Sequence, residues 1–145
     1  MNLPNLDQVV IKSLEFFSQN KPPRLDLDKK GFVLAVGSGN AFNTAKILFA
    51  GTPAIIADES NFLSTLKAYK SLIKDGSIRE AIIISASGAK DSVWEVEAAK
   101  RAGLKTRLLT CAPGSPATKI ADKVVIFRKL SEPYTYNTST YLGMI

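Results

Sequence analysis

The stretch AIIISASGAKDS, residues 81–92, changes from apolar residues to serine and glycine within a few positions. Its continuous apolar run is typical of a strand that is buried on both faces in a parallel sheet. The residues that follow permit a tight turn, and a helix starting near Lys90 would direct unpaired amide groups at the same place. The stretch therefore predicts a strand, a loop and a helix, in which Ser85, Ser87 and the backbone around Gly88 either bind an anion or simply make the turn.

Apolar runs alternate with helical patterns along most of the chain. The five runs are FVLAV (32–36), AIIA (54–57), AIIIS (81–85), TRLLT (106–110) and KVVIF (123–127). The helical patterns cover about residues 40–50, 60–74, 91–102 and 116–121. This alternation predicts an α/β fold, namely a three-layer α/β/α sandwich with a five-stranded parallel sheet in the flavodoxin-like order 2-1-3-4-5.

The N-terminal region has a different pattern. Apolar side chains recur at helical spacing from Leu6 to Phe17, and two prolines in NKPPRLDLDKKG (20–31) then interrupt that spacing. We therefore expect an N-terminal helix and linker over residues 1–30 and one α/β domain over residues 31–145.

The composition limits the class of protein. A chain of 145 residues, 46% of them hydrophobic, can form one domain with a sizeable core. Its net charge of +6 comes from basic residues scattered among acidic ones. This scatter favours a small anionic ligand at least as much as nucleic acid, because a nucleic-acid footprint needs a clustered basic face. We expect a small-molecule partner and no nucleic acid.

Signals for metal binding, disulfides and membrane insertion are missing from the sequence. The chain has one cysteine, Cys111, and no histidine, so it lacks both a disulfide pair and the commonest metal ligand. Charged residues at positions 7, 12 and 15 interrupt the apolar pattern of the N-terminus, unlike a signal peptide or a membrane span. We expect no metal, no cofactor, no membrane partner and a cytoplasmic location.

The predicted architecture also indicates where a ligand would bind. In an open α/β sheet, ligands lie beyond the carboxyl ends of the strands, where the strand order reverses. For the order 2-1-3-4-5, that point lies between the first and third strands. The loops that follow these strands are VGSGNAF (36–42) and SASGAKD (85–91), which are rich in glycine and serine. We therefore expect both loops to border one crevice.

The first of these loops leaves open a second kind of ligand. GSGNAF (37–42) is half of a dinucleotide-binding fingerprint, and Asp58 follows the second strand where a ribose-binding acid would be expected. Phe42 occupies the position of the third glycine, where a bulky side chain would push helix and strand apart. Asp58 would otherwise cap the helix that begins in ESNFLSTL. Nucleotide binding is therefore an alternative function.

Several segments together resemble the sugar isomerase (SIS) domain family. They are the glycine-rich loop after the first strand, ISASG after the third, KRAGLKTRLLTCAPGSPATKIAD through the fourth, and a glutamate followed by NTST after the fifth. The resemblance spans about residues 31–145. It implies the fold predicted above and a ligand that is a phosphorylated sugar, bound either by an isomerase or by a regulatory domain. The chain is similar to a single SIS domain or to the first half of a double-SIS protein.

The resemblance also implies which residues bind the ligand. Ser85, Ser87 and Gly88 match the phosphate loop of the family, whereas Lys90 stands where the family has threonine and Ala41 where it often has serine or threonine. The implied phosphosugar-binding residues are Gly37, Ser38, Gly39, Asn40, Ser85, Ser87, Gly88, Ala89 and Lys90.

Glu132 matches a glutamate that some family isomerases carry after the fifth strand. It is the candidate catalytic base for moving a proton between C1 and C2 of a sugar phosphate, although it could equally be a loop acid near Arg128 or Lys129. Ring opening also requires an acid, often a histidine in this family, and this chain has none. We expect a binding or regulatory module or one half of an isomerase, with isomerase activity through Glu132 as the alternative.

The C-terminal stretch NTSTYLGMI (137–145) predicts a helix with Thr138 or Ser139 as its N-cap. The helix would be truncated and would end in apolar residues, leaving a patch of Tyr141, Leu142, Met144 and Ile145 facing solvent. Because such a patch favours association, we expect a homodimer or a second SIS domain as partner.

Overall fold

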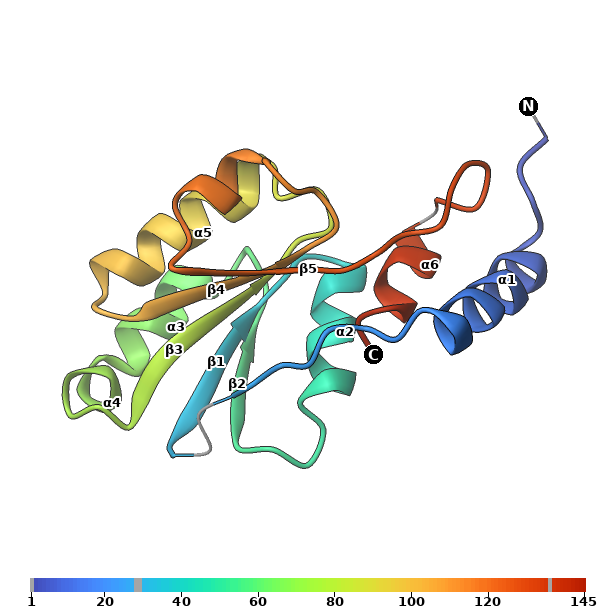
Figure 1. The fold of residues 1–145 in the computed structure, drawn as a ribbon. Coiled ribbons are helices and arrows are strands. Elements are labelled where there is room, and N and C mark those ends of the chain that lie inside the picture. The colour runs from blue at the N-terminus through green and yellow to red at the C-terminus, as the bar shows by residue number, and fades with distance from the viewer. Residues whose placement is uncertain (1, 28–29, 136) are drawn as a thin grey trace.

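The computed structural model describes residues 2–27, 30–135 and 137–145. Five parallel strands form one sheet in the order β2-β1-β3-β4-β5, with helices around it (Figure 1). The strands are β1 (Phe32–Val36), β2 (Ala54–Ala57), β3 (Ile78–Ile84), β4 (Lys105–Thr110) and β5 (Lys123–Ile126). The helices are α1 (Leu6–Gln19), α2 (Asn40–Leu48), α3 (Phe62–Ala68), α4 (Lys70–Lys74), α5 (Lys90–Arg101), the 3-10 helix η1 (Pro116–Lys119) and α6 (Asn137–Leu142). The predicted fold class and strand order are confirmed.

The central strands form where the apolar runs are longest. Ala81–Ile84 of β3 are all buried, and β-branched isoleucine fits a strand that is covered on both faces. β3 starts at Ile78, earlier than its apolar run indicates. The difference arises because the strand also includes the charged residues Arg79 and Glu80, which an apolar pattern does not reveal. The edge strands differ from the expectation of complete burial, since Lys123 and Ile126 of β5 are exposed.

The helix predicted over residues 60–74 is two helices in the structure. α3 and α4 meet at Tyr69, where the backbone leaves helical geometry (φ −100°, ψ 16°). Trp94 of α5 packs against Phe62 of α3 with ring centroids 6.1 Å apart, so Trp94 belongs to the packing between these helices.

Each face of the sheet has its own apolar core, and different helices cover the two faces (Figure 1). One core contains Leu34, Ile83 and Leu108 and is closed by α3, α5 and η1. The other contains Ala35, Ile82 and Leu109 and is closed by α2 and α6 together with Leu25 and Leu27 from the linker. The linker therefore contributes to the core. The predicted boundary near residue 30 stays a prediction.

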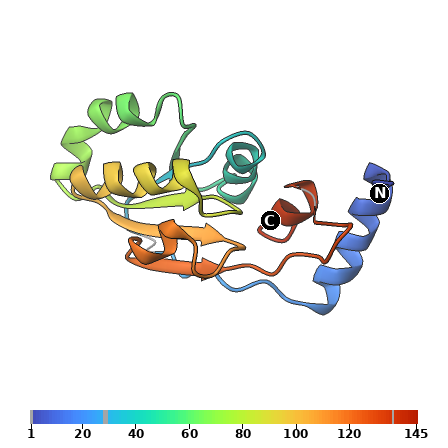
Figure 2. The same ribbon diagram turned by 90° about the horizontal axis from the view of Figure 1, so that it is seen from above.

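The C-terminal tail is covered by the rest of the chain. α6 packs against α1 and α2, and α1 lies beside α6 rather than on the sheet (Figure 2). Met144 is 3% exposed, and a Cβ at Gly143 would lie 2.2 Å from Cζ of Phe17. The expected solvent-facing patch is therefore wrong, because tertiary packing covers it and leaves Ile145 as its exposed member.

The predicted N-cap of this helix is also wrong. Thr138 and Ser139 lie inside α6, which begins at Asn137, and residue 136 lies outside the described residues. Exposed apolar side chains occur on the N-terminal segment instead, at Leu3, Leu6, Ile11 and Leu14. The expected pairing with a second copy or a second domain stays a prediction. Over the ranges that the structure describes, no helix is long and apolar enough to cross a membrane.

Candidate functional site

The strand order reverses at β1, which pairs with β2 on one side and β3 on the other. The loops after β1 and β3 therefore leave the sheet at adjacent positions along its carboxyl edge, as expected from the sequence. α2 begins after the first loop and α5 after the second. Two helix N-termini thus lie at the place where open α/β sheets bind their ligands.

The loop after β3 is held by bonds within itself and to the end of β4. The Gly88 amide donates to the carbonyl (3.2 Å) and hydroxyl (3.1 Å) oxygens of Ser85. The Ala86 carbonyl accepts from the Thr110 hydroxyl and from the Cys111 amide, each at 3.0 Å. Gly88 itself has φ +57°, and a Cβ at this position would lie 2.1 Å from Oγ of Ser115. Only glycine fits this turn without displacing its neighbours.

α5 begins at Lys90 without a side-chain cap. Its N-cap residue is Ala89, which has no polar side chain, and the first-turn amides of any α-helix have no intrahelical acceptor. The exposed Ser87 hydroxyl makes no hydrogen bond with a described residue. Lys90 places a positive charge at the positive end of the helix dipole, which is unfavourable unless an anion lies nearby. This N-terminus can therefore accept an anionic group.

The loop after β1 has the same character. α2 begins at Asn40, its N-cap is Gly39 with φ +54°, and it has no side-chain cap. Ser38 donates its hydroxyl proton to Oε2 of Glu59 at 2.8 Å. A Cβ at Gly37 would lie 2.7 Å from Cβ of Ala41, so the small side chains at both positions allow α2 to approach the strand closely.

A buried carboxyl group lies on α5 one turn beyond its start. Glu95 is 2% exposed, and its Oε1 has no hydrogen-bond partner among the described residues. Burial, followed by the negative charges of Asp91 and Glu59, raises the pKa of Glu95 to about 8. Glu95 is therefore neutral at pH 7. The sequence does hold a signal for this group, because Glu95 lies three residues after Ser92 and four before Ala99, on the face of α5 that the fold buries.

Tyr141 joins the site from the far end of the chain. Its hydroxyl oxygen accepts a hydrogen bond from the Ala86 amide at 3.4 Å, and burial raises the pKa of the phenol. The sequence placed Tyr141 on a solvent-facing patch. The 55 residues that separate it from Ala86 explain why only the folded structure brings the two together.

Glu132 lies on the loop between β5 and α6. Its carboxylate is exposed and accepts a hydrogen bond from the Thr135 hydroxyl in the same turn. Among the described residues, no hydrogen bond or ion pair joins Glu132 to the loops after β1 and β3. Its role as a base therefore stays a prediction.

The acid that could have bound a ribose instead shapes the turn before α3. Oδ1 of Asp58 accepts from the Ser60 amide (2.8 Å), the Ser60 hydroxyl (2.5 Å) and the Asn61 amide (3.1 Å). These bonds, led by the Ser60 hydroxyl, lower the pKa of Asp58. Phe42 is half-buried, with Nζ of Lys46 4.2 Å from its ring centroid. α3 has Asn61 as its N-cap and no side-chain cap, so the expectation that Asp58 caps this helix is wrong. Asp58 instead closes the turn that precedes it, and nucleotide binding stays an alternative prediction.

Comparison with known proteins identifies the fold. No protein-family model and no curated protein sequence matches this chain. Solved structures do match. A Listeria monocytogenes protein described as a sugar-phosphate isomerase is 17% identical, with a TM-score of 0.59 over 99% of this chain and 72% of that one. The sugar isomerase domain of an RpiR transcription factor from Sphaerobacter thermophilus is 21% identical, with a TM-score of 0.58 over 95% and 86%.

A third structure, the Vibrio vulnificus NanR protein complexed with ManNAc-6P, is 15% identical, with a TM-score of 0.63 over 94% of this chain and 55% of that one. At these identities the likeness concerns the fold. This chain has the fold of a sugar isomerase (SIS) domain, as its sequence motifs indicate.

Proposed function

We propose that this chain is a phosphosugar-binding SIS domain that acts in the cytoplasm as a binding or regulatory module or as one half of an isomerase. The observation that supports this most directly is the pair of uncapped helix N-termini at the point where the strand order reverses. Neighbours in structure include a transcription-factor domain and a NanR protein complexed with a sugar phosphate.

The two loops would bind different parts of the ligand. Ser85, Ser87 and the amides of Ala89 and Lys90 would bind the phosphate, because hydroxyl and amide donors converge at the start of α5, while Gly88 shapes the turn by donating its amide to Ser85. The loop Gly37–Asn40 would contact the sugar. The carboxylate of Glu59, which already accepts from Ser38, would accept hydrogen bonds from sugar hydroxyls.

Replacing both serines of the phosphate loop should weaken sugar-phosphate binding strongly. Hydrogen bonds to charged groups contribute about 1.5–3 kcal/mol each, so Ser85→Ala/Ser87→Ala should lower the affinity for fructose 6-phosphate by at least about tenfold. Isothermal titration with fructose 6-phosphate, free fructose and ADP measures this, and the sugar phosphate should bind tightest. Ser18→Ala/Ser64→Ala is the matched control, because both hydroxyls donate only to carbonyls of their own helix. Equal affinity in the two double variants would refute the assignment.

The isolated chain should bind sugar phosphate without interconverting aldose and ketose. Isomerisation needs an acid for ring opening and a base at C1 and C2, and the chain has no histidine in any copy. The assay follows fructose 6-phosphate and its aldose partners by NMR over hours with the purified chain and with Glu132→Gln. Turnover that disappears in Glu132→Gln would make the chain an isomerase with Glu132 as its base.

A further inference from the structure

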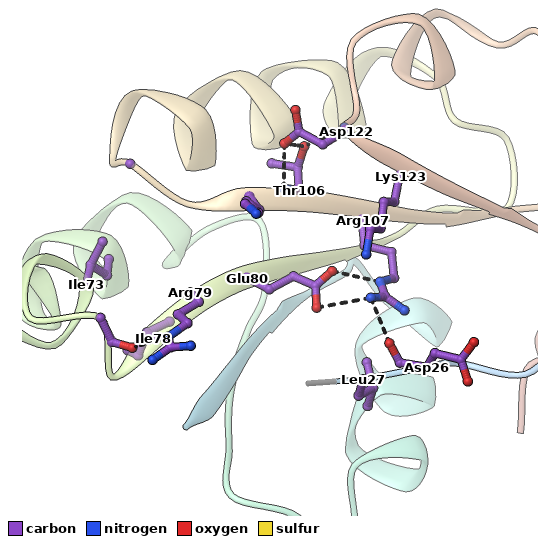
Figure 3. A pocket seen from close by; sticks show the side chains of 13 residues that line it. Asp26, Leu27, Ile73, Ile78, Arg79, Glu80, Thr106, Arg107, Asp122 and Lys123 are labelled. Carbon is purple, nitrogen blue, oxygen red and sulfur yellow. Dashed lines mark hydrogen bonds and ion pairs between the residues drawn. The ribbon is translucent and has the colours of Figure 1, made fainter. Parts of the chain in front are cut away.

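A cavity of about 610 Å³ lies at the opposite edge of the sheet, at the amino ends of β3, β4 and β5 (Figure 3). Its wall combines apolar and charged side chains. Leu27 and Ile73 supply apolar surface above the buried Ile78, and the basic residues are Arg79, Lys105, Arg107 and Lys123. A cavity of this volume is in the range that holds a small organic molecule.

Arg107 is held in the wall by contacts to two separate parts of the chain. It is 5% exposed, and its Nε and Nη2 donate to the Glu80 carboxylate at 2.7 and 3.4 Å. Nη2 also donates to the backbone carbonyl of Asp26 in the linker at 3.0 Å (Figure 3). These three bonds fix the plane of the guanidinium group, so the group is preorganised for a further acceptor.

The hydrogen-bond donors of the cavity exceed its acceptors. Nη1 of Arg107 and the side chains of Lys105 and Lys123 make no hydrogen bond or ion pair with a described residue. Two of the acidic side chains, Glu80 and Asp122, already accept hydrogen bonds from other residues. Glu80 accepts from Arg107, and Asp122 accepts from the Thr106 amide and hydroxyl and from Lys100. Asp26 points its carboxylate away from Arg107 (Figure 3).

The position of the cavity follows from how this face of the sheet is covered. The helix α2 covers β1, β2 and β3 on this face. Beside Arg107 the face is covered instead by the linker residues Asp26 and Leu27. A single extended segment covers less surface than a helix, and it leaves space over the first residues of β3 and β4. The charged side chains of Glu80, Lys105 and Arg107 share that face, since Glu80 pairs with Lys105 and Arg107 follows two residues later.

We propose that this cavity binds a small organic anion with more than one phosphate or carboxylate group, at a site separate from the carboxyl-edge loops. Nη1 of Arg107 donates to one anionic oxygen, and Lys105 and Lys123 neutralise the remaining charge. The partly exposed apolar residues Leu27 and Ile73 contact the body of the ligand. This site is independent of the phosphosugar proposal, because none of its residues belongs to the loops after β1 and β3.

The test is a titration of the ¹⁵N-labelled full chain with ADP, citrate and inorganic phosphate, followed by amide chemical shifts. We expect saturating shifts at residues 105–107 and 122–124 with ADP or citrate, and weaker binding of phosphate. Lys105→Gln/Lys123→Gln should weaken this binding about tenfold or more, because each charged donor that is lost contributes an ion-assisted hydrogen bond. Both lysines are exposed at strand starts, so the variant should stay folded.

Two control variants separate this site from other binding. Lys70→Gln/Lys74→Gln removes the same charge from α4 and should leave the affinity unchanged. Ser85→Ala/Ser87→Ala should also leave it unchanged, which separates this site from the proposed phosphate loop. Shifts that fail to saturate with all three anions, or equal affinity in the Lys105/Lys123 and Lys70/Lys74 variants, would overturn the proposal.

Discussion

Glu95→Gln should stabilise the chain at pH 7–8 by on the order of 3 kcal/mol and should change its stability little at pH 4. The carboxyl group loses its proton near its ordinary pKa of 4.5 in the unfolded chain but only at about 8 in the folded one. Between pH 4.5 and about 8, the folded chain keeps a proton on Glu95 that the unfolded chain releases. The free energy of unfolding therefore falls as pH rises through this range. Glutamine is neutral at every pH and removes this penalty.

Urea denaturation at pH 4, 6, 7 and 8 measures the effect as the difference in free energy of unfolding between variant and wild type. Glu95→Met is a second variant that carries no charge, and it should show the same dependence on pH. Glu97→Gln is the matched control. Its exposed side chain lies 3.8 Å from Arg101 on the same helix, and its loss should change stability by less than about 0.5 kcal/mol. A Glu95→Gln difference that is constant across pH would contradict the prediction.

Gly88→Ala should destabilise the chain by about 3 kcal/mol and weaken sugar-phosphate binding at the same time. A residue with a Cβ is strained at φ +57°, and the added carbon would lie 2.1 Å from Oγ and 2.8 Å from Cβ of Ser115. Relief requires moving either the loop after β3 or the segment before η1. The first movement changes where the Ser85 and Ser87 hydroxyls lie, and the second disturbs the bond by which the Ala117 amide holds the Gly88 carbonyl.

Two comparisons separate strain from steric contact in this experiment. Gly114→Ala has a similar positive φ of +78° with no atom within 4 Å of its Cβ, so it should lose only the 1–2 kcal/mol of conformational strain. Adding Ser115→Gly to Gly88→Ala should restore most of the remaining stability, because it removes both close atoms. If Gly88→Ala and Gly114→Ala are equally stable in chemical denaturation, the close approach of Ser115 has no energetic weight.

The sheet could be predicted from the sequence because its strands are continuous apolar runs bounded by glycine and polar residues. β1 and β2 begin and end where the pattern indicates. The error at β3 has a clear cause. Glu80 pairs in the sheet although it is charged, because Arg107 satisfies its carboxylate, and Arg79 lies at an irregularity in the pairing of β1 with β3.

The candidate site could be predicted only in part. The loops that contain Ser38 and Ser87 follow from the order of strands and from local glycine–serine composition. Contacts between segments that are far apart in the sequence leave no local sequence pattern from which they could be predicted. Glu59 reaches Ser38 across 21 residues, Tyr141 reaches Ala86 across 55, and Arg107 reaches Asp26 across 81. These pairs depend on how the helices and linker pack, which local sequence patterns do not encode.

The hydrogen bond between Tyr141 and Ala86 connects the loop after β3 to the N-terminal helix through α6. α6 contacts the loop after β3 through Tyr141 and contacts α1 through the Phe17–Gly143 packing. A ligand that displaces this loop would therefore shift α6 and, with it, α1. The side chains of Leu6, Ile11 and Leu14 on α1 face solvent. Linkage is reciprocal. A molecule that binds α1 would therefore change the ligand's affinity by the same factor by which the ligand changes the affinity of that molecule. The six-residue helix α6 would then link the loop after β3 to the contacts that α1 makes.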